Sequence, residues 1–394
     1  MTIIARHELY DPLFHTPRED LYEVYRRMRD DHPIYRSECR DVWCLTRFED
    51  VQAAARDWKT FSNANGVDLD TPPQFFGPGT ILEEDPPRHD VLRKVVRPFF
   101  VPKRIAALET DIALHVEELT RRLAGAGRID LAQDFAWALP VWMICRLLGV
   151  PPADDELVHG LVVELETRHP GDDLQSSGHK LVALRQLQRY AEELAAQKRQ
   201  APGDDLMSHL VASEAKGELR GEEIPGMTVL LFAAGTETTA SLIGNALFLL
   251  AEHRDAQKEL RRTPVDLVDA AIEESLRMES PVQYLARQST TSMRIHDVEV
   301  PKGADVILIY GAANRDERRF ERAETFDIHR PAQRHLAFGE GIHFCLGAPL
   351  ARLEARIALP AFLRAIPSYE IETPAERMPR HTVRGFARLP AVIG

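Results

Sequence analysis

The sequence has few cysteines and none of the cysteine patterns that build small metal or redox modules. Its 394 residues include only Cys39, Cys44, Cys145 and Cys345, which are too few for a disulfide scaffold. The pattern C-x-x-C is missing, so a zinc ribbon and a thioredoxin-like motif have no support. C-x-x-C-H is missing as well, which excludes covalent attachment of a c-type haem.

An excess of positive charge is also missing. The formal net charge is −12, whereas nucleic-acid-binding chains are usually basic. Residues 88–104 are the exception, because six basic residues there stand against Asp90 alone, a local charge of +5. We therefore expect no nucleic-acid partner, and we expect residues 88–104 to meet an acidic protein or a bound anionic group.

The chain lacks a recognisable targeting or membrane segment. Its first residues show no apolar run behind a basic start, as a signal peptide would. Residues 227–251 are long enough to cross a bilayer, but they contain Glu237 and Asn245. A carboxylate at the centre of a bilayer costs about 3 kcal/mol or more. We interpret this stretch as a buried helix, and we expect a soluble, cytoplasmic, monomeric protein that does not insert in membranes.

Helical periodicity dominates the chain, and no repeat, low-complexity tract or linker interrupts it. Apolar spacing and breaker residues predict helices over residues 21–31, 48–56, 89–100, 105–123, 135–148, 154–198 (two helices broken near 170–171), 225–253, 264–278 and 348–366. Short strands are predicted near residue 34 and over 42–46, 294–309 and parts of 368–394. Residues 62–87 form a loop long enough to suggest a functional role. The pattern predicts one mainly α domain over residues 1–394 with small β elements.

The first chemical signal is residues 338–347, a glycine-rich loop that holds Cys345 directly before a predicted helix. Glycines allow the backbone to approach a ligand closely. Backbone N–H groups at a helix N-terminus stabilise a thiolate, and Phe338 and Phe344 would shield it. An inert buried cysteine is an equally good interpretation of this loop alone.

Two further signals lie on predicted helices. Residues 233–239 (Ala-Ala-Gly-Thr-Glu-Thr-Thr) place small and hydroxyl side chains where a core helix usually carries leucine, which leaves room for a flat ligand. A helix crossing that needs small residues is the alternative. Glu274 and Arg277 are spaced to pair on one helix face, although most such pairs are solvated and contribute little.

Taken together and in this order, the three signals resemble the cytochrome P450 family, in its soluble bacterial form, over essentially the whole chain. The loop matches the pattern F-x-x-G-x-x-x-C-x-G, and Glu274–Arg277 matches E-x-x-R. His89 and Arg93 match H-x-x-x-R, and the segment from Phe326 to Phe338 resembles the approach to the cysteine loop. The sequence departs from the usual pattern at Asp316-Glu317, where Asp-Pro is common, and at Glu237, where many members carry Asp.

The resemblance implies a cytochrome P450 fold and haem b as cofactor, with the following residue roles. Cys345 would be the axial ligand of the haem iron, Thr238 and Glu237 would handle oxygen and protons, and Gly235 would let the helix open there. The haem propionates would be held by His89, Arg93, Arg287 and His343. The buried ion network behind the haem would consist of Glu274, Arg277 and Arg330. The substrate wall would include Phe75, Phe76, Ile81, Leu230, Ala233, Ala234, Val282, Gln283, Tyr284, Leu285 and Phe386.

The implied activity is insertion of one oxygen atom of O2 into an apolar small organic molecule, by hydroxylation or dealkylation. The chain offers no room for a fused reductase, so a separate ferredoxin or flavodoxin is expected to dock near Arg93, Lys94, Arg97, Arg352 and Arg356. Three alternatives stay open from the residues. A haem-thiolate peroxygenase would usually lack the Glu237–Thr238 pair, a haem sensor or carrier would not need it, and a cysteine hydrolase would need a base beside Cys345.

Overall fold

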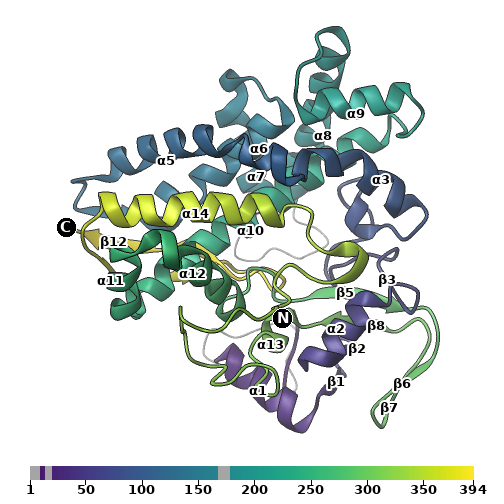
Figure 1. The fold of residues 1–394 in the computed structure, drawn as a ribbon. Coiled ribbons are helices and arrows are strands. Elements are labelled where there is room, and N and C mark those ends of the chain that lie inside the picture. Colours follow the sequence, from purple (N-terminus) through teal and green to yellow (C-terminus); the bar gives the residue numbers. More distant parts are fainter. Residues whose placement is uncertain (1–8, 14–19, 167–177) are drawn as a thin grey trace.

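The computed structural model describes residues 9–13, 20–166 and 178–394, and helices dominate it (Figure 1). The α-helices are α1 (Leu21–Asp31), α2 (Phe48–Arg56), α3 (Arg88–Val96), α4 (Pro102–Ala106), α5 (Glu109–Leu123), α6 (Ala138–Leu148), α7 (Asp155–Glu166), α8 (Gly178–Gln200), α9 (Leu206–Ala215), α10 (Glu223–Glu252), α11 (Arg254–Arg262), α12 (Pro264–Met278), α13 (Tyr310–Ala313) and α14 (Ala348–Ala365). Shorter turns are η1 (Ile81–Glu83), η2 (Arg97–Phe100), the π-helical η3 (Leu131–Ala136), η4 (Pro152–Asp154) and η5 (Gly341–His343).

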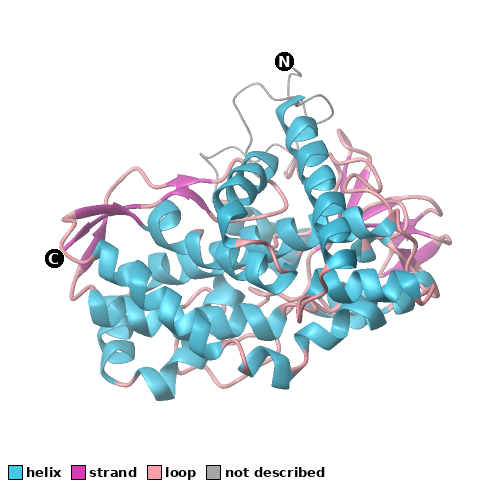
Figure 2. Ribbon diagram, turned by 90° about the horizontal axis from the view of Figure 1, so that it is seen from above, coloured by secondary structure: helices cyan, strands magenta, loops and turns pink. Residues whose placement is uncertain are grey.

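The strands form small sheets at two ends of the helical body (Figure 2). They are β1 (Ile34–Ser37), β2 (Val42–Leu45), β3 (Phe61–Ser62), β4 (Arg128–Asp130), β5 (Leu285–Ser289), β6 (Met293–Ile295), β7 (Val298–Val300), β8 (Asp305–Leu308), β9 (Tyr369–Ile371), β10 (Glu376–Arg377), β11 (Phe386–Arg388) and β12 (Pro390–Ile393). The largest sheet has the order β1-β2-β8-β5-β3, in which β2 and β8 run parallel and the other neighbours antiparallel. The prediction of a mainly α fold with small β elements is confirmed.

Several predicted boundaries were wrong. The helix expected over 89–100 ends as α3 at Val96, and η2 follows because Pro98 has no N–H to continue the α-helical ladder. The helix expected over 105–123 is divided into α4 and α5. Strand β5 and helices α9 and α11 were not predicted, since each is short. The predicted break near residues 170–171 lies outside the described residues.

Helix α10 runs through the centre of the molecule, next to α6, α8, α12 and α14 (Figure 1). Its apolar stretch and that of residues 131–148 are long and apolar enough to cross a membrane, but 78% and 72% of these stretches is buried within the protein. Burial of this kind is typical of core helices. The interpretation of residues 227–251 as a buried helix is confirmed.

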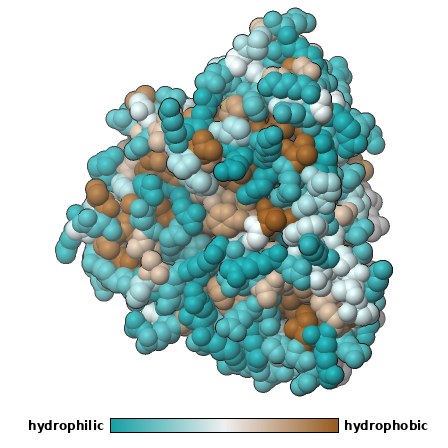
Figure 3. Space-filling view, turned by 45° about the vertical axis from the view of Figure 1, so that its right-hand side comes forward, coloured by the Kyte–Doolittle hydropathy of each residue, from teal (hydrophilic) through white to brown (hydrophobic). Residues whose placement is uncertain are grey.

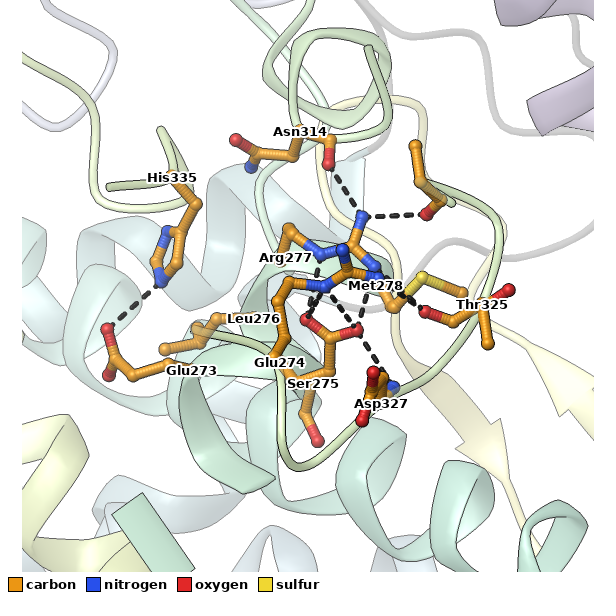
Figure 4. A network of polar contacts seen from close by, with 12 residues as sticks. Glu273, Glu274, Ser275, Leu276, Arg277, Met278, Asn314, Thr325, Asp327 and His335 are labelled. Carbon is orange, nitrogen blue, oxygen red and sulfur yellow. Dashed lines mark hydrogen bonds and ion pairs between the residues drawn. The ribbon is translucent and has the colours of Figure 1, made fainter. Parts of the chain in front are cut away.

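Behind the core, Glu274 and Arg277 of α12 form a buried ion network (Figure 4). The Arg277 guanidinium donates two hydrogen bonds of 2.8 Å to the Glu274 carboxylate, and both residues are less than 5% exposed. Arg330 Nε donates to the same carboxylate at 3.0 Å and 3.1 Å. The remaining Arg277 N–H groups bond the carbonyls of three loop residues, Asn314, Ala323 and Thr325. The network therefore joins α12 to residues 314–330, a long segment that contains no helix or strand.

Replacing Arg277 by alanine should greatly reduce the yield of folded protein. Glu274 would keep Arg330 and the Asp327 N–H but lose its buried Arg277 partner, and breaking a buried pair costs about 3–5 kcal/mol. The measurement is soluble yield and the midpoint of thermal unfolding, with Arg322→Ala as the matched control, because Arg322 pairs with Asp327 on the surface. Wild-type stability in Arg277→Ala would contradict a supporting role for the network.

Candidate active site

The cysteine loop is held in shape by its own backbone. Cys345 N donates to Phe338 O at 2.9 Å, which closes the loop over η5. Gly341 has a φ of 72°, and a Cβ at this position would lie 2.6 Å from the carbonyl oxygen of Ala55. Only glycine meets both conditions, because other residues disfavour this φ and α2 leaves no space for a side chain.

The Cys345 thiol opens into the central cavity, just before the first residue of α14. Burial raises the pKa of the Cys345 thiol, while backbone N–H groups of Gly347 and Ala348 and the nearby Arg93 lower it. The N–H groups and the cation stabilise a thiolate, and the Cys345 side chain is exposed toward the cavity. A positively charged metal ion at the sulfur would offset the burial cost.

Four donor groups from distant parts of the chain gather at the same cavity: His89, Arg93, Arg287 and His343. The rings of His89 and His343 lie 4.6 Å apart, and the Nε2 atoms of both are buried without a hydrogen-bond partner. Burial and the nearby Arg287 hold the pKa of His343 far below its usual value. Arg287 is 3% exposed, which excludes a surface role.

The cluster of these four residues is therefore cationic and has unused donors in a buried place. Arg93 donates to the carbonyl of Phe344, and Arg287 donates to the carbonyl of Ala286 and to the Tyr310 hydroxyl. None of the ion pairs in the described residues joins Arg93 or Arg287 to a carboxylate. Two carboxylates of a ligand would satisfy these donors, so the residues fit a haem, which carries two propionates beside its iron.

The cavity has a volume of about 990 Å³ and is lined largely by apolar side chains. The predicted wall residues that line it are Phe75, Phe76, Ile81, Leu230, Ala233, Ala234, Val282 and Leu285. Three predictions were wrong: Gln283 bonds the Ser280 carbonyl, Tyr284 is a core residue bonded to the Pro12 carbonyl, and Phe386 packs against Phe248 with ring centroids 5.1 Å apart. Phe386 points behind α10 rather than into the cavity.

Thr238 and Glu237 both line this cavity from the middle of α10. The Thr238 hydroxyl donates to the Ala234 carbonyl at 2.8 Å, four residues earlier, as helical threonines often do. Glu237 is 3% exposed. Burial raises the pKa of Glu237 to about 8, against the opposing effect of Arg380. Glu237 is therefore mostly protonated at neutral pH and can donate a proton.

Gly235 serves the packing of α10 as well as the cavity. A Cβ at this position would lie 3.2 Å from Ile144 Cδ1 of α6. Helix α10 continues without a break through residues 235–238. The expectation of an opened helix at Gly235 is therefore wrong for this structure, since close contact between α6 and α10 already explains the glycine.

Sequence reasoning missed the polar part of the cavity wall, which includes Asp68, Glu83, Glu166, Lys180 and Arg380. Acidic residues crowd the loop 62–87, a signal that could have indicated Asp68 and Glu83. Glu166 and Arg380 had no such signal, because they are 214 residues apart and meet only in the folded chain. A purely apolar wall is therefore an incomplete description of the site.

The residues expected to bind an electron donor differ in whether they are exposed and whether a carboxylate already pairs with them. Arg352 donates to Glu273 at 2.6 Å and Arg356 to Asp269 at 2.6 Å, so their charges are largely compensated. Arg93 points into the cavity. Lys94 and Arg97 are exposed and form no ion pair within the described residues. The face drawn in Figure 3 is mostly hydrophilic, with apolar residues in separate patches.

Gly341→Ala should destabilise the loop that carries Cys345. The left-handed backbone costs a non-glycine residue about 1–2 kcal/mol, and the new methyl group would also clash with Ala55 O. Gly303→Ala is the matched control, because Gly303 has a φ of 82° with nothing within 4 Å of a Cβ. Thermal unfolding should show a larger loss for Gly341→Ala than for Gly303→Ala, and equal losses would contradict the steric explanation.

Comparisons with known proteins agree with this geometry. Residues 178–391 match the family model described as Cytochrome P450. Cytochrome P450 107B1 of Saccharopolyspora erythraea is 38% identical, over 94% of this chain and 95% of that protein. Cytochrome P450 monooxygenase PikC of Streptomyces venezuelae is 35% identical, over 94% of this chain and 90% of that protein.

Solved structures show the same similarity. The structure of the bacillaene polyketide synthase cytochrome P450 PksS of Bacillus subtilis superimposes with a TM-score of 0.89 at 31% identity, over 98% of this chain and 100% of that one. Proteins of this family bind haem b. The fold, the cysteine loop and this similarity over nearly the whole chain lead to one conclusion: the chain belongs to the cytochrome P450 family and is a monooxygenase of that family.

Proposed function

We propose that this monooxygenase inserts one atom of O2 into an apolar small organic molecule, by hydroxylation or dealkylation. In hydroxylation, the substrate C–H bond and O2 with two electrons and two protons give a C–OH group and water. The observation that carries the proposal is that Cys345, the cationic cluster and the Glu237–Thr238 pair all face one cavity with a largely apolar wall. Apolar walls with a few placed polar groups are typical of sites for small molecules.

The residues of the cavity support one arrangement for haem b. Cys345 would bind the iron, and His89, Arg93, Arg287 and His343 would hold the propionates through charge-assisted hydrogen bonds. A thiolate-bound haem supplies the activation of O2. The chain's own contribution is to hold the thiolate at the N-terminus of α14, where backbone N–H groups and Arg93 stabilise its charge.

Glu237 and Thr238 are the residues we assign to proton handling. Glu237 is buried and holds a proton at neutral pH, and Thr238 is its neighbour on the cavity face of α10. The Thr238 hydroxyl, which now bonds the Ala234 carbonyl, is the group that would position a donor water over the reacting oxygen. The substrate would lie between α10, residues 75–81 and residues 282–285.

The electrons come from a separate protein, which we propose is an acidic ferredoxin or flavodoxin. Residues 1–394 would act as a single haem domain in the cytoplasm, as a monomer. Lys94 and Arg97 are the exposed positive charges that support docking on this side, because complementary charge speeds association of such partners. Arg352 and Arg356 contribute less, since Glu273 and Asp269 already bind them.

Cys345→Ser should abolish the carbon monoxide difference spectrum that is typical of a thiolate-bound haem. A neutral hydroxyl is a poor iron ligand at neutral pH, so the reduced protein would lose the thiolate signature. Cys39→Ser is the matched control, because Cys39 is exposed and far from the loop in sequence. An unchanged spectrum in Cys345→Ser would falsify the assignment of the iron ligand.

Thr238→Ala should keep haem and substrate binding but lose product formed per NADH, while hydrogen peroxide rises. The loss should be about 10-fold or more, as for removal of a group that positions a proton. Glu237→Gln should instead slow turnover more than it lowers coupling, because it removes the proton donor itself. The measurement is NADH consumed, product formed and peroxide released with a ferredoxin.

Thr228→Ala is the matched control for Thr238→Ala. Thr228 bonds the Ile224 carbonyl at 2.7 Å in the same helix but does not line the cavity, so its variant should retain wild-type coupling. If Thr238→Ala also retains wild-type coupling, Thr238 does not position the proton donor.

A further inference from the structure

Arg380 joins Glu237 to a second buried carboxylate. Arg380 Nη1 donates to Glu166 Oε2 at 2.6 Å, and Arg380 Nε lies 3.1 Å from Glu237 Oε1. Glu166 also acts on Glu237 as a nearby negative group and raises the pKa of the Glu237 carboxyl. Glu166 is the last residue of α7, Glu237 is in the middle of α10, and Arg380 lies between β10 and β11. Three separate parts of the chain therefore meet at one proton site on the cavity wall.

Among the described residues, the carboxyl groups around Arg380 outnumber the cations, so protonation of one of them reduces the excess negative charge. Glu166 and Glu237 are 8% and 3% exposed, and two buried carboxylates beside one guanidinium would leave an excess negative charge. Asp68 and Asp70 add negative charge near Arg380, and His381 lies 3.3 Å from Asp70. Lys180 of α8 is a further cation that acts on Glu237. Two buried carboxyl groups that share one cation favour a proton on Glu237.

We propose that Glu166 and Arg380 are positioning residues that act on Glu237 in opposite directions, so that Glu237 holds a proton at neutral pH and can still release it. The inference rests on the proposed role of Glu237 in proton delivery. Glu166 is the negative neighbour that opposes ionisation of Glu237. Arg380 holds the Glu237 side chain in place, and its positive charge partly offsets the effect of Glu166. Neither residue touches the reacting atoms.

We expect Glu166→Gln and Arg380→Gln to shift the pH dependence of product formation in opposite directions. Protonated Glu237 is the donor, so product formation by the wild type should fall as the pH rises through about 8, the pKa of Glu237. Glu166→Gln removes the negative neighbour, so the pKa of Glu237 falls and the loss of activity moves to lower pH. Arg380→Gln removes the cation, so the pKa rises and the loss moves to higher pH. A nearby charge shifts a pKa by about 1–3 units.

Infrared difference spectroscopy of the haem-loaded protein gives a second readout that does not depend on turnover. The carbonyl stretch of a protonated carboxylic acid that disappears in Glu237→Gln identifies Glu237. The pH midpoint of this band should move to lower pH in Glu166→Gln and to higher pH in Arg380→Gln. Arg377→Gln is the matched control, because Arg377 bridges to buried Glu279 from the same segment but does not line the cavity. Its midpoint should equal that of the wild type.

The outcomes separate this inference from the proposed function. Equal or same-direction shifts in Glu166→Gln and Arg380→Gln would overturn the inference, and so would the same shift in Arg377→Gln. If Glu237→Gln still loses turnover in that case, the assignment of Glu237 as the proton donor stands. Wild-type turnover and pH profile in Glu237→Gln would instead overturn that assignment, and the inference with it. Variants that do not fold are replaced by Glu166→Asp and Arg380→Lys, which keep the charge and should keep the wild-type midpoint.

Discussion

The carboxylate of Glu274, buried between two guanidinium groups, is the interaction on which the cysteine loop depends. Arg277 binds Glu274 and also the carbonyl of Asn314, and the Asn314 side chain accepts a hydrogen bond of 2.6 Å from Leu336 N, two residues before Phe338. Glu273, the residue before Glu274 in α12, bonds His335 and Arg352. Helix α12 therefore fixes the chain on both sides of Cys345, before the loop and on α14.

The cavity that results carries opposite charges in two places. The cluster of His89, Arg93, Arg287 and His343 is cationic and has donors to spare, whereas Asp68, Glu83 and Glu166 are acidic. A buried charge without a counter-charge is costly, so the cationic cluster and the acidic residues each need a different compensating group. The cationic cluster fits carboxylates of a cofactor. Burial raises the pKa of Asp68 and of Glu83, so these two acids hold protons more readily than exposed ones, which suits a reaction that consumes protons.

How far the sequence predicts this site depends on the distance in sequence between the interacting residues. The Cys345 loop and the Glu274–Arg277 pair are local patterns. Each alone left an alternative open, but together their spacing was enough to show the resemblance that implied their roles. Arg380 and Glu166 interact across 214 residues without any periodic signal, so only the folded chain reveals them. Phe386 was misplaced for a related reason: a strand of three residues, β11, is too short for its alternation to show which side faces the cavity.

The contact between Glu237 and Arg380 gives a reason for a glutamate, rather than an aspartate, at position 237. Aspartate is more usual at this position, and its carboxylate would end one carbon–carbon bond, about 1.5 Å, closer to the helix. The Glu237 backbone carbonyl already accepts the Ser241 hydroxyl at 2.7 Å, which keeps this turn of α10 regular. With the helix fixed, the extra methylene is what brings the Glu237 carboxylate to within 3.1 Å of Arg380, which also binds Glu166. The longer side chain thus matches the presence of a second carboxylate at the end of α7, and the two features belong to one proton site.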